Sequence, residues 1–191
     1  MLFVGDLSNG DIRLVKSINS LPFPKAVILG NHDRGGDTFG SQLKAQNNLL
    51  GENNCAWSLK ILDTPHISVV GARPCSAGGG YHLSSQMKSV FGQVSMNTSI
   101  KMIVDAALEA PLSIPLLILA HSGPTGLGSD YSSICGRDWR DPSIDWGDKD
   151  LELAINQIQA HRKIDLVVFG HMHHKLKKGK GTRKSFQIDN L

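Results

Sequence analysis

Four short apolar runs dominate the pattern of this chain, and each is followed within two positions by a polar residue with a metal-binding side chain. The runs lie at 1–4, 26–29, 116–120 and 166–169. Apolar runs of this length predict buried strands, and in an open α/β sheet the chemistry gathers at the carboxyl ends of the strands. The polar residues that follow the runs are therefore candidates for one shared site.

Apolar residues at helical spacing predict helices between these strands. The expected helices lie at 11–19, near 40–50, at 97–109 and from 151 to 158, with Asn97, Thr98 or Ser99 as the cap of the third. Further strands are expected at 57–62, 67–70 and 182–188, the last at an edge. Strands that alternate with helices predict an α/β fold with helices on both faces of a sheet.

Two polar, glycine-containing loops separate these elements. In residues 73–81, Arg73 and Tyr81 flank a glycine-rich turn. This segment either faces a substrate, with amides or the guanidinium on a phosphate, or is an ordinary connection. Residues 122–148 form a long loop, and loops of this length are more often functional than idle. Five of its charged residues either shape a specificity lid or face solvent, namely Asp130, Arg137, Asp138, Arg140 and Asp141.

The composition is that of a globular protein. The 191 residues are 40% apolar and 19% charged, which predicts one domain, spanning 1–191, with a sizeable core. The net charge of +3 is too small to argue for nucleic acid, so a nucleic-acid partner is not expected. Much of the positive charge lies between Lys175 and Lys184, either on a solvated hairpin or on a surface that attracts phosphate-rich partners.

The cysteine and hydropathy patterns indicate the kind of compartment in which the protein is expected. Cys55, Cys75 and Cys135 are widely spaced and form no CxxC pair, which argues for a reducing compartment and against a thiolate metal site. No apolar run approaches the length of a transmembrane helix, and no signal peptide is visible. We therefore expect an intracellular, soluble protein without a membrane partner.

The polar residues behind the apolar runs share one chemistry. Asp6 follows the first run, Asn31 and His32 the second, His121 the third and His171 the fourth. Carboxylate, amide and imidazole groups without a thiolate suit Mn, Fe or Zn in a hydrolytic centre better than a structural zinc site. The pattern therefore predicts a hydrolytic metal centre.

These residues belong to motifs that resemble a known family. Gly5-Asp6, Gly30-Asn31-His32-Asp33, His121 and Gly170-His171-Met172-His173 resemble, in order and spacing, four of the five motifs of the calcineurin-like metallophosphoesterases. The resemblance implies a β-sandwich flanked by helices around two divalent metal ions. It also implies that a metal-bound hydroxide hydrolyses a phosphate mono- or diester in a phosphorylated small molecule, protein or nucleotide. The chain further resembles an uncharacterised plant and cyanobacterial branch, which implies the cytoplasm or the plastid stroma.

The resemblance also assigns roles to individual residues. It implies a set of metal ligands with Asp6 as the bridge, Asn31, His121 and His171 in one site, and His173 at the other metal. His32 would stand near the leaving-group oxygen as general acid or charge stabiliser, with Asp33 orienting its ring.

The fifth family motif, Asp-x-His at the end of the first strand, is absent from this sequence. In the family it precedes the Gly-Asp motif, at which this chain starts, so we expect a domain shortened at the N-terminus that lacks the first strand. One metal site then keeps four ligands, whereas the other keeps Asp6 and His173. The alternative to an active hydrolase is therefore a catalytically impaired form that binds one metal or a phosphorylated partner.

Overall fold

The computed structural model describes residues 1–177 and 181–184, and these residues contain two β-sheets. The smaller sheet pairs β1 (Leu2–Phe3) with β2 (Ala26–Val27) in parallel. The larger sheet has the order β3-β4-β5-β6, with strands at Leu59–Asp63, His66–Gly71, Leu116–Leu119 and Leu166–Val168. β3 and β4 run antiparallel, whereas β4, β5 and β6 run parallel to one another.

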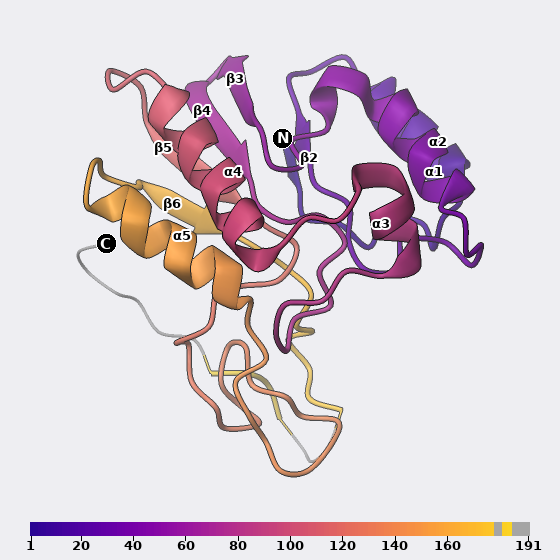
Figure 1. Ribbon diagram of the computed structural model, residues 1–191, viewed down its shortest axis with the longest axis vertical. Coiled ribbons are helices and arrows are strands. Elements are labelled where there is room, and N and C mark those ends of the chain that lie inside the picture. The colour runs from indigo at the N-terminus through magenta and orange to yellow at the C-terminus, as the bar shows by residue number, and fades with distance from the viewer. Residues whose placement is uncertain (178–180, 185–191) are drawn as a thin grey trace.

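Helices flank these sheets (Figure 1). They are α1 (Ile12–Asn19), α2 (Ser41–Leu50), α3 (Ser85–Phe91), α4 (Met96–Glu109) and α5 (Lys149–Gln159), with a 3-10 turn at Gly51–Asn53. α4 and α5 pack against each other over the larger sheet, and α1 and α2 pack together beside the smaller one. The predicted α/β architecture with sheets flanked by helices is confirmed, and the loss of a first strand stays a prediction.

α4 illustrates how the local sequence begins a helix. The Ser95 hydroxyl accepts a hydrogen bond from the Thr98 N–H at 3.1 Å, so the cap is Ser95 and not one of the three residues predicted. Such a cap contributes ~1 kcal/mol. Ile100 and Ile103 lie on the buried face of the helix. Burying a side chain of this size contributes roughly 1.5–3 kcal/mol, so packing on α5 and β4 dominates the stability of α4.

The buried apolar side chains of the described residues form a cluster that spans both sheets. Ile28 and Leu29 after β2, and Ile118 and Leu119 in β5, are fully shielded from solvent. Strands buried on both faces are continuous apolar runs in the sequence, which is why these segments were recognisable there. The shared core holds the carboxyl ends of β1, β2, β5 and β6 in fixed positions.

Residues 122–148, 172–177 and 181–184 leave the strand region and form a lobe below the sheets in Figure 1, here called the lower lobe. Arg183 fastens its two segments together. The Arg183 guanidinium pairs with Asp138 at 3.0 Å and donates to the Ser133 carbonyl at 2.8 Å.

The predicted strand at 182–188 lies mostly outside the described residues. Within them, Thr182 forms an isolated antiparallel bridge with Lys175. Residues 185–188 of that prediction are not described by the structure.

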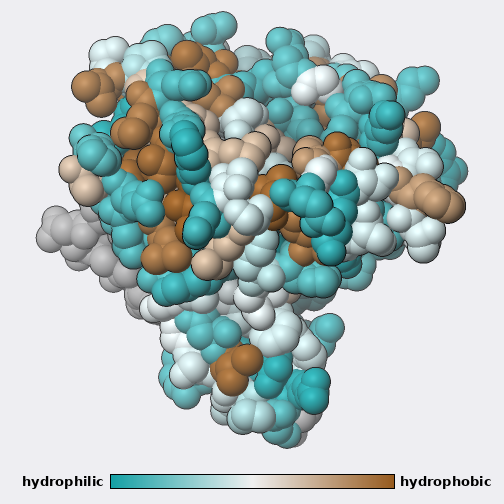
Figure 2. Space-filling model, viewed as in Figure 1, coloured by the Kyte–Doolittle hydropathy of each residue, from teal (hydrophilic) through white to brown (hydrophobic). Residues whose placement is uncertain are grey.

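The surface differs between the helices and the lower lobe. On the face seen in Figure 2, apolar side chains gather over α4 and α5, whereas the lower lobe is mostly hydrophilic. None of the helices within residues 1–177 and 181–184 combines the length and the apolar character that crossing a bilayer requires.

Candidate metal centre

Three strand ends converge on one point of the structure. Asp6 follows β1, His121 follows β5 and His171 follows β6, and their ligand atoms all lie within 4.8 Å of one another. Asn31, which follows β2, joins them because its Oδ1 lies 3.0 Å from His121 Nε2. The fold therefore brings four of the five predicted metal ligands together at the carboxyl ends of strands, where α/β folds bind their ligands.

The close approach of the loops after β1 and β2 depends on Gly30. A Cβ atom added to Gly30 would lie 2.3 Å from the Asp6 nitrogen and 2.6 Å from His121 Cε1. Only glycine leaves room for Asp6 and His121 to approach each other. Asp6 and His171 also have φ angles of 54° and 66°, a left-handed conformation that costs a residue with a side chain roughly 1–2 kcal/mol. Strain of this kind concentrates at functional sites.

The hydrogen bonds of His121 determine which ring nitrogen is available to a ligand. Its Nδ1 lies 2.6 Å from the carbonyl oxygen of Val4, and because a carbonyl only accepts, Nδ1 carries the proton. The lone pair of Nε2 therefore faces the cluster, where Asn31 Oδ1 lies 3.0 Å and Asp6 Oδ1 lies 3.3 Å away. That oxygen already accepts the backbone N–H of His32 at 2.9 Å. A nitrogen lone pair and a carboxylate oxygen that face one point are the arrangement that a cation stabilises.

Burial keeps both imidazoles in the neutral form that binds metals. Desolvation lowers the pKa of His121, against the opposing effect of the Asp6 charge. Desolvation and the neighbouring His121 lower the pKa of His171 to about 4. At neutral pH the cluster thus offers two neutral imidazoles, a carboxylate and the Asn31 amide oxygen. This donor set fits a divalent ion such as Mn, Fe or Zn.

His32 and His173 lie around the cluster rather than in it. Both are exposed, and both line the cavity that opens over the cluster. Among the described residues, the group whose ligand atoms meet within 4.8 Å does not include His173. The backbone carbonyl of His173 instead accepts a hydrogen bond from Arg183 Nε at 3.0 Å. Its assignment to a second metal stays a prediction.

Asp33 is fully buried behind the ligand loops. Its Oδ1 accepts the Ser8 N–H and its Oδ2 accepts the Gly30 N–H, both at 2.8 Å. Burial raises the pKa of Asp33, against the lowering effect of these two hydrogen bonds. The side chain therefore ties the loop after β1 to the loop after β2, and its role in orienting the His32 ring stays a prediction.

A cavity of about 300 Å³ opens over the cluster, and part of its wall comes from the lower lobe. That part contains Trp139, Trp146, Lys175 and Lys177. Sequence reasoning missed the two tryptophans. The signal that could have found them is that two of the three tryptophans in the chain occur in one polar loop behind a predicted ligand.

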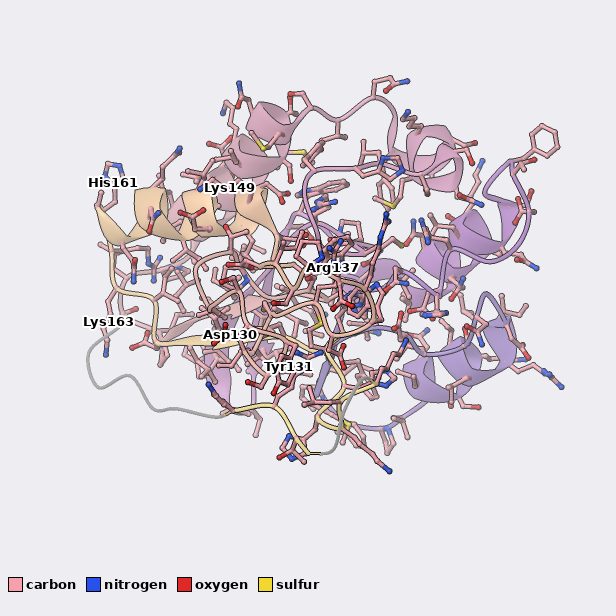
Figure 3. The ribbon with its side chains drawn as sticks, turned by 90° about the horizontal axis from the view of Figure 1, so that it is seen from below. Asp130, Tyr131, Arg137, Lys149, His161 and Lys163 are labelled. Atoms are coloured by element: carbon pink, nitrogen blue, oxygen red, sulfur yellow. The ribbon has the colours of Figure 1, made fainter. Side chains whose placement is uncertain are left out.

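Two charged residues that were candidates for a lid are buried supports of this wall. Asp138 pairs with Arg183, and its other carboxylate oxygen accepts the Lys177 N–H. Arg137, labelled in Figure 3, places its guanidinium 4.9 Å from the ring centroid of Trp146. These contacts hold the loop segment that carries the tryptophans.

Arg73 lies in a buried ion-pair network and is 2% exposed. Its guanidinium donates to Asp148 at 2.7 Å and to Asp150 at 3.0 Å, which fastens the glycine-rich loop to the start of α5. Burial and the neighbouring Asp150 raise the pKa of Asp148 to about 7, although Arg73 acts to lower it. The interpretation of Arg73 as a phosphate ligand is therefore wrong.

The comparisons with known proteins give one match. A family model described as calcineurin-like phosphoesterase matches residues 1–175, a range that includes every residue of the cluster. No curated protein and no solved structure matches the chain.

Proposed function

Because the chain belongs to the calcineurin-like phosphoesterase family, we propose that it hydrolyses a phosphate mono- or diester with a divalent metal ion held at the cluster. The family membership supports metal-dependent phosphoester hydrolysis in general. The observation that carries the proposal for this chain is the convergence of Asp6, Asn31, His121 and His171 beside one cavity.

The ligand side chains are held in place before an ion arrives. When bound, the ion supplies positive charge that polarises a phosphoryl oxygen and activates water. The backbone N–H of His32 holds the Asp6 carboxylate in place. The Val4 carbonyl holds the ring of His121 with its unprotonated Nε2 towards the cluster. Side chains that are already oriented need little reorganisation when an ion binds, and this favours a productive geometry.

We assign proton transfer to the leaving group to His32. This residue follows the ligand Asn31 directly, and its exposed side chain lines the cavity. A general acid in such a position contributes roughly 10²–10⁴-fold to the rate. Lys175 and Lys177 line the same cavity and would neutralise the charge of a bound phosphate.

We propose that one ion is held tightly. The four convergent side chains make a complete set of protein ligands for one ion, with room left for water or substrate. A second ion would rely on Asp6 and His173, and His173 lies outside the cluster among the described residues. Tight binding of one ion fits both the enzyme and the impaired form, so hydrolysis has to be measured separately.

The variant His171→Gln tests the proposal, with His161→Gln as its matched control. His171 contributes a ligand atom, whereas His161 is an exposed histidine beyond the end of α5. We expect His171→Gln to lower metal affinity by at least about 100-fold, since even residues behind the ligands contribute 10–100-fold. Elemental analysis after gel filtration reports metal content, and nitrophenolate release from 4-nitrophenyl phosphate and its bis-ester reports hydrolysis.

The outcomes separate the candidate functions. Unchanged hydrolysis by the His171→Gln variant would overturn the proposed centre. A wild-type protein that retains one ion and cleaves neither ester would support the impaired form instead. Cleavage of one ester and not the other would decide between mono- and diesterase action.

A further inference from the structure

Two tryptophans share the wall of the cavity that contains Asp6 and His171. A cavity of about 300 Å³ is at the small end of the range for small-molecule sites. Neither the metal ligands nor the proposed proton transfer involves an aromatic wall. The tryptophans therefore need an account in terms of the organic part of the substrate.

Trp146 is a fixed support. Its Nε1 donates to the Ala77 carbonyl at 2.8 Å, and Arg137 lies 4.9 Å from its ring centroid. The ring also packs on Gly79, where an added Cβ would lie 2.4 Å from Trp146 Cε2. With these contacts in place, the Trp146 ring is anchored, and it meets Trp139 with ring centroids 5.4 Å apart and planes at 80°.

Trp139 is the tryptophan that remains accessible, since 37% of it is exposed. A large aromatic side chain that stays exposed inside a cavity is suited to contact with a ligand. The ammonium of Lys177 lies 5.7 Å from the Trp139 ring centroid, near the outer limit of about 6 Å for attraction between a cation and a ring. The attraction between this ammonium and the ring is therefore a weak one.

The charges of the wall favour an anion next to this ring. Arg183 and Asp138 pair with each other at 3.0 Å, so their charges cancel. Lys175 and Lys177 line the cavity, and Lys177 adds positive charge beside Trp139. One wall of the cavity thus combines an accessible aromatic surface with two ammonium groups, and the metal ligands lie in the same cavity.

We propose that the substrate is a nucleotide, whose base stacks on Trp139 while its phosphate lies between the two lysines and the metal ligands. This inference rests on the proposed function, because it takes the phosphate to the same cluster. Every nucleobase has a planar face that stacks on an indole, and a bare sugar phosphate has none. Trp146 orients Trp139 for that stack, and the size of the cavity suits a mononucleotide.

The test compares adenosine 5′-monophosphate with ribose 5-phosphate, two esters that differ by the base. The variants are Trp139→Ala, Trp139→Phe and, as control, Phe39→Ala, which removes an aromatic residue that is 81% exposed and does not line this cavity. Hydrolysis is measured as kcat/KM with added Mn²⁺. Binding is measured separately by isothermal titration calorimetry in the presence of chelator, where hydrolysis does not proceed.

We expect the wild-type protein to prefer the nucleotide by roughly 5- to 150-fold in both measurements, the range that stacking of one base provides. Trp139→Ala should bring the ratio close to one, whereas Trp139→Phe and Phe39→Ala should keep most of it. Equal values for the two esters in the wild-type protein, or an unchanged ratio in Trp139→Ala, would overturn the nucleotide inference and leave the phosphoesterase proposal standing. If no ester is hydrolysed, including the nitrophenyl esters, the phosphoesterase proposal fails, and the calorimetric ratio still decides whether the cavity selects nucleotides.

Discussion

Replacing Gly30 by alanine introduces one methyl group between Asp6 and His121 without removing any ligand. The new Cβ would lie 2.3 Å from the Asp6 nitrogen and 2.4 Å from Asp6 Oδ1. Real Cβ contacts are essentially never shorter than 3.0 Å, so the Asp6 loop must retreat by roughly 0.7 Å or more. The three nearest contacts of this Cβ are to the Asp6 backbone and to the side chains of Asp6 and His121, so no flexible side chain outside the cluster can absorb the shift.

The displacement has two measurable costs. Overpacking of this kind destabilises a protein by about 1–3 kcal/mol, which corresponds to a fall in Tm of roughly 2–12 °C for a chain of this length. A misplacement approaching 1 Å also costs about 100-fold in catalysis. We therefore expect Gly30→Ala to lose about 100-fold in kcat/KM and to bind metal weakly, although all four ligands are present.

The assay combines thermal unfolding, metal content after gel filtration and hydrolysis of 4-nitrophenyl phosphate. Gly36→Ala is the matched control, because a Cβ at Gly36 meets nothing within 4 Å. The control should behave as the wild-type protein in all three measurements. Wild-type metal content and activity in Gly30→Ala would refute the reasoning that the ligand geometry depends on this close approach.

Two further predictions concern buried charges around the centre. The pKa of Asp148 is raised to about 7. The stability that this carboxyl group contributes is therefore complete below pH 3.8, its ordinary pKa, and is lost as the pH rises through 7. Urea unfolding measures this at pH 5 and pH 8. From pH 5 to pH 8 the free energy of unfolding of the wild-type protein should fall relative to that of Asp148→Asn by a few kcal/mol, at about 1.4 kcal/mol per pH unit up to the raised pKa. Parallel pH profiles of the two proteins would contradict the raised pKa of Asp148. Arg183→Lys keeps the charge but loses most of the hydrogen bonds to Ser133, Gly136 and His173, each worth about 0.5–1.5 kcal/mol. Limited proteolysis should then cut the lower lobe faster in this variant than in the wild-type protein. Equal cleavage rates would show that Arg183 does not hold the segments of the lobe together.

The residues of the cluster could be predicted from the sequence because each one lies within two positions of the end of an apolar run. Position in the chain alone then implies position in space, as for His121 after β5 and His171 after β6. Other features depend on contacts that no local pattern marks. Arg73 meets Asp148 across 75 positions of sequence, so its burial could not be distinguished from exposure on a loop.

Short or weakly patterned segments were also difficult to predict. α3 has seven residues, of which Met87 is buried, and so small an apolar face gives little periodic signal. The placement of Trp139 in the cavity wall depends on the fastening of the lower lobe by Arg183, which lies more than 40 positions later in the chain. A sequence pattern identifies the residue at the end of a strand more readily than it identifies the residues against which a loop packs.

The strand ends and the lower lobe contribute different groups to one cavity. The groups that would hold the ion stand on the rigid sheet framework, and the groups that would contact the organic part of the substrate stand on loops outside it. The lobe is therefore an exchangeable part. Replacing residues 139–146 with a segment of different shape and polarity, while the supports Arg137 and Asp138 stay in place, would redirect the choice of ester and leave the reacting centre its chemistry. This region is therefore the natural starting point for altering specificity by design.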